Sequence, residues 1–340
     1  MILALAPQGG LLASRAVEAT GLARVTVSRR IQKLADLGYL QRHGGGTRPG
    51  YSLGVNRFWT ARQARPEIEA HGGEFAVWER HLAPLLGEVP ANVVSIANTA
   101  FTEMLNNAID HSQAQQVLMG IHVARGRLQM AVMDDGVGVF RKIGKALGLF
   151  DDRLAILELA KGKYTTAPQA HSGMGVFVTS RMLDGFAVHS KGLTYAPRTP
   201  AGVDLGFAWT YVPPWLNGTV VLMDIALDAT RKANDVYDRY FSPDEVGAEA
   251  FHTTEVPVRL AELSSELTSR SQGKWVIERA SQFKTVLLDF DGVQTVGQAF
   301  VDEIFRVFAL AHPEVTLKAL HLDPRVRRNI QMFAPHFRLT

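Results

Sequence analysis

Apolar side chains recur at helical spacing in residues 101–112, Phe-Thr-Glu-Met-Leu-Asn-Asn-Ala-Ile-Asp-His-Ser. Glu103 and Asn107 occupy the polar face, one above the other, because residues four apart are neighbours on a helix surface. The pattern predicts a helix packed on a core, with a carboxylate and a carboxamide that could share a water or a metal-bound phosphate. The apolar face has the spacing i, i+3, i+4, i+7 and i+8 and consists of Phe101, Met104, Leu105, Ala108 and Ile109.

Two glycine-rich segments come after this helix. Residues 134–138, Asp-Asp-Gly-Val-Gly, close an apolar run predicted as a buried strand. A carboxylate at the end of a buried strand needs a hydrogen-bond donor, and glycines let the backbone pass close to a ligand. Residues 171–175, His-Ser-Gly-Met-Gly, precede a predicted helix whose first N–H groups suit phosphate. Taken alone, each segment is also typical of an ordinary turn.

The surrounding pattern predicts a two-layer α/β sandwich over residues 92–228. Its long helix would cover a mostly antiparallel sheet. Residues 140–170 form a long connection with a helix of its own at 152–160, and connections of this length are more often functional than not. Strands are expected at 116–123, 128–134, 186–190, 205–212 and 219–226.

Residues 11–54 have the pattern of a winged helix-turn-helix, within a predicted domain at 1–57. Ser14 is expected to cap a helix that Gly21 ends. A second helix is expected at 24–37, and residues 38–54 form a hairpin with its tip at 43–50. The second helix is expected to bury Val25, Val27 or Ser28, Ile31 and Leu34.

The excess of basic residues in this domain indicates the kind of partner that it binds. Residues 1–65 carry ten Arg and Lys against two acidic residues, although the whole chain has a formal charge of only +3. A basic end on a near-neutral chain predicts a polyanion partner. The segment resembles bacterial winged-helix repressors, which implies contact with double-stranded DNA. The predicted contact residues are Arg24, Thr26, Ser28, Arg29, Arg30 and Lys33 on the second helix and Arg48 at the hairpin tip. The alternative is a winged helix that makes only protein contacts.

Residues 58–91 are predicted to be a connector. Proline and glycine interrupt them, and apolar positions between 75 and 86 predict a short amphipathic helix packed on the next domain. His81 lacks the acidic neighbour that stands after a phosphoacceptor histidine, so we interpret it as an interface residue.

Together, the helix and the glycine segments resemble the Bergerat-fold ATPases of gyrase, Hsp90, histidine kinases and MutL. They match its N-box (E-x-x-x-N-A), its D-x-G-x-G box and its G-x-G lid hinge, and residues 140–170 correspond to its ATP lid. The resemblance implies ATP and Mg²⁺ as cofactors. Glu103 would polarise the attacking nucleophile and Asn107 would coordinate Mg²⁺. The implied nucleotide-binding residues are Asn107, Asp134 (at the adenine amino group), Gly136, Gly138, Lys163, Gly173, Gly175 and Thr219. Lys161 could meet the γ-phosphate in place of Lys163, and an ordinary solvated lysine is the alternative for both.

Residues 229–340 predict a third, α/β unit. Their alternation of strands and helices resembles the STAS-like domains of the DUF4325 type. STAS domains that antagonise anti-sigma factors carry a phosphorylated serine after the central strand, whereas the corresponding turn here is Gly-Gln-Ala at 297–299. Thr295 is nearby, but phosphorylation in cis is not expected. The resemblance therefore implies docking of a protein partner or self-association, including a homodimer. Strands are expected at 256–263, 285–290 and 315–322, and helices at 231–240, 298–311 and 324–333.

The chain is thus expected to be an α/β multidomain protein of the cytoplasm. No cysteine is present, which excludes disulfides and thiol catalysis and suits a reducing compartment. No apolar run reaches membrane-spanning length, so membrane contact is not expected. The expected function is an ATP-binding transcription regulator whose nucleotide state controls DNA binding or partner docking. Two alternatives are a serine/threonine kinase that acts on a separate partner and an ATPase effector of a stress or defence operon.

Overall fold

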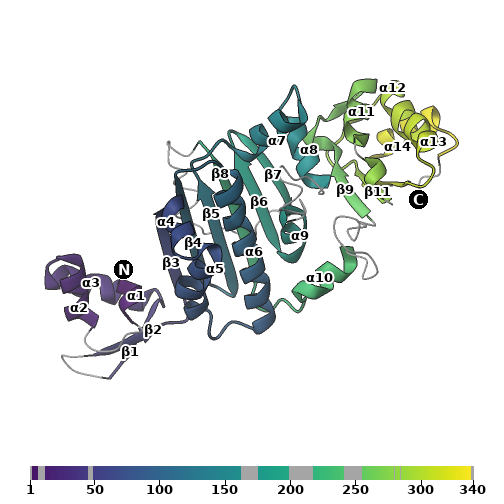
Figure 1. Ribbon diagram of the computed structural model, residues 1–340. Helices are drawn as coiled ribbons and strands as arrows, with labels where there is room; N and C mark the ends of the chain where they lie inside the picture. The colour runs from purple at the N-terminus through teal and green to yellow at the C-terminus, as the bar shows by residue number, and fades with distance from the viewer. Residues whose placement is uncertain are drawn as a thin grey trace. The chain divides into compact units, whose positions relative to one another are not determined.

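The structure is a computed structural model of the 340-residue chain (Figure 1). It describes residues 2–6, 12–44, 49–161, 175–198, 217–240, 255–278, 280–283 and 285–337. The chain divides into two compact units. Unit 1 is made of residues 1–136, 183–188 and 198–232, and unit 2 of residues 137–182, 189–197 and 233–340. No helix in the described ranges is long and apolar enough to cross a membrane.

Unit 1 begins with three helices and a hairpin, of which the second and third helices and the hairpin come in the predicted order. Ala16, Val27 and Ile31 lie in a small core with Leu40 at the start of the hairpin. The two strands pair antiparallel from Leu40 opposite Leu53 to His43 opposite Gly50. The elements are α1 (Ile2–Leu5), α2 (Leu12–Thr20), α3 (Arg24–Asp36), β1 (Leu40–His43) and β2 (Gly50–Leu53).

Two local predictions in this region were wrong. Helix α2 begins at Leu12, so Ser14 lies inside its first turn and is not its N-cap. Val25 is 64% exposed instead of buried. Two residues turn a helix by about 200°, so Val25 points away from the core once Val27 and Ile31 face it. Gly21 adopts the expected left-handed conformation after α2, with φ of +65°.

A six-stranded sheet has the strand order β3-β4-β5-β8-β6-β7. The first four of these pair antiparallel, and β5 and β8 are almost completely buried. The predicted strands at 116–123, 128–134, 186–190 and 219–226 are confirmed, whereas the one at 205–212 lies outside the described residues. The strands are β3 (Arg57–Ala64), β4 (Gln116–Ala124), β5 (Arg127–Asp134), β6 (Gly185–Ser190), β7 (Leu193–Arg198) and β8 (Thr219–Ala226).

The predicted connector begins with a strand that the sequence pattern did not show. β3 pairs with β4 over eight positions, from Arg57 opposite Val123 to Ala64 opposite Gln116. Its side chains are mostly half-buried, because β3 is the first strand in the order of the sheet. The expected helical part comes next as α4 (Arg65–Ala70), α5 (Gly73–Val77), the π-helix η2 (Trp78–Leu82) and the 3-10 turn η3 (Ala83–Leu85).

Helix α6 (Ala91–His111) runs along the sheet in Figure 1. The apolar face predicted for it is buried from Phe101 to Ile109, and α6 extends that face toward its start with Val93, Ile96 and Ala97. The burial of this stripe confirms that the helix packs on a core.

Unit 2 begins with the described part of the predicted lid. Helix α8 matches the helix expected at 152–160, but α7 was not predicted. The residues between α8 and α9 lie outside the described part of the chain. The helices are α7 (Val139–Leu147), α8 (Arg153–Lys161), α9 (Gly175–Met182) and, later in the chain, α10 (Ala233–Tyr240).

The C-terminal part of unit 2 alternates strands and helices, as expected. Its main sheet is parallel with the order β13-β11-β9, and β10 pairs with β12 in a second, two-stranded sheet. The strand predicted at 256–263 ends early, at Arg259, where a 3-10 turn begins. The strands are β9 (Glu255–Arg259), β10 (Glu266–Leu267), β11 (Thr285–Asp289), β12 (Thr295–Val296) and β13 (Thr316–Leu320).

The helices of this part share one hydrophobic core with the parallel sheet. Ser269 and Gln272 form a reciprocal capping box at the start of α11. The predicted helix at 298–311 is continuous, but its middle is a π-helix. The elements are η5 (Leu260–Glu262), α11 (Arg270–Ile277), η6 (Ala280–Gln282), α12 (Gln298–Asp302), η7 (Glu303–Phe308), α13 (Ala309–Ala311) and α14 (Pro324–Phe333).

Helix α8 belongs to the hydrophobic core of this C-terminal part. Leu154 and Leu157 are buried in one cluster with Val258 of β9 and Val286 of β11. Just before α8, the ring of Phe150 lies 4.8 Å from that of Trp275. The prediction that placed the lid in the 92–228 domain did not anticipate this packing.

Candidate functional site

The polar face of α6 carries an unsatisfied amide. The side-chain Nδ2 of Asn107 is buried and has no hydrogen-bond partner within the described structure. Which end of an amide is oxygen is decided by its hydrogen bonds, so a ligand here could meet either atom. Leaving a buried polar group unpaired costs about 1–3 kcal/mol. Asn107 is therefore placed for a water or a ligand, and Glu103 stands one turn before it.

Asp134 lies at the end of β5 and is 4% exposed. Its Oδ1 accepts hydrogen bonds from the backbone N–H of Gly136 at 2.9 Å and from that of Thr219 at 3.3 Å. Burial raises the pKa of Asp134 to about 6. The two hydrogen bonds favour the charged form and lower the pKa, but their effect is smaller than that of burial. A carboxylate whose charge is this costly is typical of a ligand-binding position.

Two glycines bring the backbone around Asp134 into close contact. A Cβ on Gly136 would lie 2.1 Å from the carbonyl oxygen of Ser112, just after α6. A Cβ on Gly218 would lie 2.2 Å from the carbonyl oxygen of Asp134. Only glycine fits at either position. The ends of α6 and β5 and the start of β8 therefore meet around one carboxylate.

In unit 2, Gly138 precedes α7 with φ of +87°. A Cβ at this position would lie 2.6 Å from the Oγ of Ser190 and 3.1 Å from the Cε of Lys191. Gly138 is thus required both by its backbone conformation and by the side chains that cover it. Lys191 was not predicted from the sequence, because Lys191-Gly192 looks like an ordinary hairpin turn between β6 and β7.

Of the remaining predicted nucleotide-binding residues, the structure describes two and leaves two outside its described ranges. Thr219 is brought beside Asp134, as its hydrogen bond shows. Gly175 is the first residue of α9. Lys163 and Gly173 lie outside the described residues, so their predicted roles stay predictions. Sequence reasoning also missed Ser112, whose carbonyl lies against Gly136 and whose Oγ accepts from the N–H of Ala114 at 2.9 Å.

The donor set fits ATP with a magnesium ion. Asp134 offers a buried acceptor, the glycines leave room for close approach, and the Asn107 amide nitrogen lacks a partner among the described residues. Among the residues that the structure describes, no group of three or more His, Cys, Asp or Glu could hold a metal ion. The ion would therefore depend on Asn107, on phosphate oxygens and on water, as Mg²⁺ commonly does.

The predicted DNA-contacting residues of α3 share one property: all are exposed. The outward-facing set is Arg24, Thr26, Ser28, Arg29, Arg30 and Lys33. Arg48 lies outside the described residues. The exposed positions leave the α3 surface basic, which is what contact with phosphates requires.

Comparison with known proteins concerns the C-terminal part of the chain. No curated protein sequence matches. Residues 272–327 match the family model described as a STAS-like domain of unknown function, DUF4325. The matched residues run from within α11 to within α14 and include β11 and the π-helical segment. The resemblance to STAS-like domains drawn from the sequence is therefore confirmed for residues 272–327.

Proposed function

We propose that this protein is an ATP-binding regulator in which the nucleotide site around Asp134 controls the binding of DNA by α3. The observation that carries the proposal is the buried carboxylate of Asp134, held by two backbone N–H groups in a place that only glycines allow. A carboxylate whose charged form is destabilised by burial is typical of a position that recognises a ligand. The unpaired amide of Asn107 on α6 supports a polar ligand on the same unit.

Each residue has a role that its chemistry suits. Asp134 would accept a hydrogen bond from the amino group of the adenine. Asn107 would hold Mg²⁺ through its carboxamide oxygen, a ligand that suits a hard cation. Glu103 would accept the proton of the attacking water or hydroxyl. When bound, Mg-ATP would supply a phosphoanhydride bond and a cation that neutralises the charge of the phosphates.

The α7–α8 segment offers a route from the nucleotide to the STAS-like domain. It begins directly after Gly138 and ends in the C-terminal core through Leu154 and Leu157. Packed cores transmit displacements because they contain little free volume. A ligand that binds one arrangement of Gly138 and α7 better than another would therefore also shift the STAS-like domain.

A second route leads from the sheet to α3 within unit 1. Only three residues separate β2 from β3, and their backbone is hydrogen-bonded: the N–H of Gly54 donates to the carbonyl of Tyr39 and that of Asn56 to the carbonyl of Gly38. The hydroxyl of Tyr39 also lies 3.0 Å from Nε2 of His122 on β4. The α3 domain is therefore tied to the sheet by more than a flexible tether.

The test is DNA binding by the purified full chain, measured by fluorescence anisotropy without nucleotide, with ATP and with ADP. We expect the affinity for DNA to differ between these states and the difference to vanish in Asp134→Ala. Glu79→Ala, an exposed change on η2, is the matched control and should behave like the wild type. Equal DNA affinity in all nucleotide states would contradict the proposal.

The fate of γ-labelled ATP then separates the three chemistries. Free labelled phosphate that disappears in Glu103→Ala indicates an ATPase. Label on this chain or on an added protein indicates a kinase. If ATP binds without any label moving, the nucleotide acts as a switch ligand only.

A further inference from the structure

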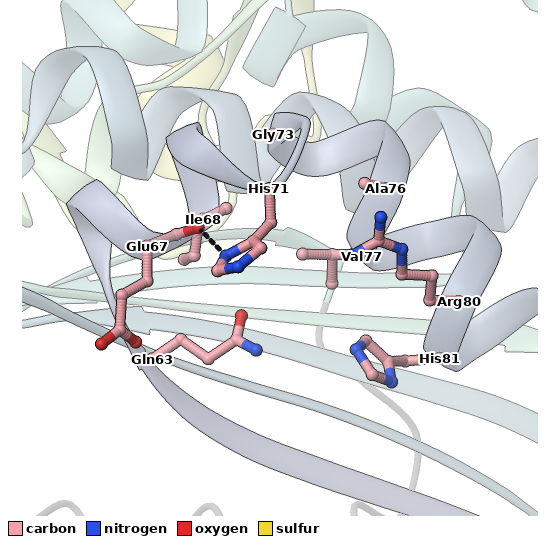
Figure 2. A pocket seen from close by; sticks show the side chains of 9 residues that line it. All are labelled: Gln63, Glu67, Ile68, His71, Gly73, Ala76, Val77, Arg80 and His81. Carbon is pink, nitrogen blue, oxygen red and sulfur yellow. Dashed lines mark hydrogen bonds between the residues drawn. The ribbon is translucent and has the colours of Figure 1, made fainter.

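A separate pocket of about 210 Å³ lies on the helical part of unit 1 that precedes α6 (Figure 2). Residues of β3, α4, α5 and η2 form it, and Ile68 and Val77 give it a buried apolar floor. Its polar lining consists of the carboxylate of Glu67 and four nitrogen-bearing side chains: Gln63, His71, Arg80 and His81. None of these residues belongs to the candidate nucleotide site.

Local backbone geometry positions these side chains. Gly72 and Gly73, with φ of +101° and +67°, turn the chain between α4 and α5. The next helix then widens into the π-helix η2, a feature that is common at functional sites. η2 carries both Arg80 and His81, and the His81 ring stacks on Trp59 of β3 with centroids 5.0 Å apart. The ring of His81 is therefore held in one orientation.

The second histidine is also held in place. Nδ1 of His71 lies 2.6 Å from the carbonyl oxygen of Glu67, and a carbonyl can only accept, so Nδ1 carries the proton. Nε2 of His71 is then available to a ligand. Figure 2 shows the side chain of Glu67 at one end of the pocket and that of Arg80 at the other. His71 and Gln63 lie between the acidic and the basic group, and the ring of His81 lies at the Arg80 end.

Among the described residues, the charge of Arg80 has no counterpart, because its guanidinium makes no ion pair and no hydrogen bond with any of them. Burial and the nearby Arg80 lower the pKa of His81, so its imidazole is neutral at pH 7. The Arg80 end of the pocket is therefore positive, because the neutral imidazole of His81 and the apolar floor carry no charge. An anionic group would satisfy it.

We propose that this pocket binds a small molecule through an oxyanion, a carboxylate or a phosphate group, which pairs with Arg80 and hydrogen-bonds to His71, His81 or Gln63. The volume fits a ligand of a few heavy atoms and is small beside ordinary cofactor pockets of about 300–1,000 Å³. The ligand would contact β3, the strand that continues directly from the β1–β2 hairpin. The pocket is therefore an input site for a small metabolite, distinct from ATP.

The test uses the full chain and two probes, sodium phosphate and sodium acetate, titrated at constant ionic strength against sodium chloride and followed by NMR of the histidine Cε1–H signals. We expect saturable shifts for at least one probe. The probe that binds more tightly identifies the anion. Arg80→Gln should weaken binding about tenfold or more, because it removes a charged hydrogen-bond donor. Glu79→Gln, an exposed neighbour that does not line the pocket, should bind as the wild type does.

A titration of His81 gives an independent readout. The charged and titratable groups around it are Glu67, His71 and Arg80. A bound anion favours the imidazolium, so saturating probe should raise the pKa of His81, and by linkage the probe should bind more tightly at lower pH. Asp134→Ala should leave this response intact. Shifts no larger than with chloride, or binding unchanged in Arg80→Gln, would overturn the proposal while leaving the nucleotide site untouched.

Discussion

The backbone N–H of Thr219 donates a hydrogen bond to Oδ1 of Asp134, 85 positions earlier in the chain. Gly136 donates to the same oxygen at 2.9 Å. The carboxylate therefore does two things at once: it joins the end of β5 to the start of β8, and it presents a buried acceptor beside glycines. These two roles can be separated by mutation.

Asp134→Asn should stabilise the folded chain and abolish nucleotide binding. The pKa of Asp134 is raised from 3.8 to about 6, so the folded state prefers the neutral carboxyl. The stability that this preference contributes is full below pH 3.8 and is lost as pH rises through about 6. Asparagine keeps an oxygen for Gly136 and Thr219 without a charge, but its N–H₂ group would face the amino group of the proposed adenine, donor against donor.

We expect a gain of about 1–3 kcal/mol at pH 7.5 that disappears near pH 4. Urea unfolding of both proteins at several pH values measures the gain, and isothermal titration with ATP measures binding. A gain that is independent of pH would show that the charge of Asp134 is not its cause.

Gly136→Ala should destabilise unit 1 severely. The new methyl group would lie 2.1 Å from the Ser112 carbonyl and 2.9 Å from Oδ1 of Asp134, so the backbone must move. We expect a loss of about 3 kcal/mol or more, or failure to fold. Gly87→Ala is the control, because nothing lies within 4 Å of its Cβ position. Thermal unfolding monitored by circular dichroism compares the two, and equal melting temperatures would refute the crowding argument.

Arg127→Met should cost about 3–5 kcal/mol, because it removes the guanidinium that donates two hydrogen bonds to the buried carboxylate of Asp224. The side chain of Asp224 is 1% exposed, and Arg127 donates to both of its oxygens, at 2.7 and 2.5 Å. The double change Arg127→Met with Asp224→Leu should recover most of the loss. Arg231→Met, which breaks a partly exposed pair with Asp184, is the milder control. Urea unfolding decides: similar losses for both single changes would mean that burial of Asp224 is unimportant.

Leu157→Ala should loosen the STAS-like domain even though Leu157 lies in the predicted lid. Its side chain is 1% exposed, within the C-terminal core, and a buried leucine truncated to alanine costs about 2–5 kcal/mol. Hydrogen exchange should show faster exchange in β11 and β9 and unchanged exchange in β4 and β5. Leu147→Ala on α7, which is 37% exposed, should change little. Faster exchange in β4 and β5 alone would mean that α8 supports the large sheet instead.

Arg29→Ala should weaken DNA binding and flatten its dependence on salt. Each phosphate contact contributes a slope of about −0.9 to the logarithm of affinity against the logarithm of salt concentration. Arg29 is exposed on α3, and Arg141→Ala on α7 serves as a control of equal charge change. Titrations at several salt concentrations should show a slope reduced by about one only in Arg29→Ala. Identical slopes would favour the protein-contact alternative for this domain.

The parts of the fold that could be predicted from sequence are those with a strong local signal. The apolar stripe on α6 and the buried run before Asp134 each fit a single period, and both elements lie where expected. The edge strand β3 was missed because it alternates weakly, as half-buried strands do. The docking of α8 was missed because helical spacing shows that a face is buried but not which partner buries it. Lys191 was missed because it looks like part of an ordinary hairpin turn, and its contact with Gly138 joins residues that are distant in sequence.

The place of α8 in the C-terminal core also constrains how the protein is made. Leu157 leaves the ribosome about 100 residues before Val258, the first strand residue of its cluster. At about 5–20 residues per second, the apolar face of α8 waits roughly 5–20 seconds for the rest of its core. During that interval the helix is a target for chaperones and an aggregation risk. Fragments that end before β9 should therefore be poorly behaved, and the C-terminal domain expressed alone should lack a helix that its core needs.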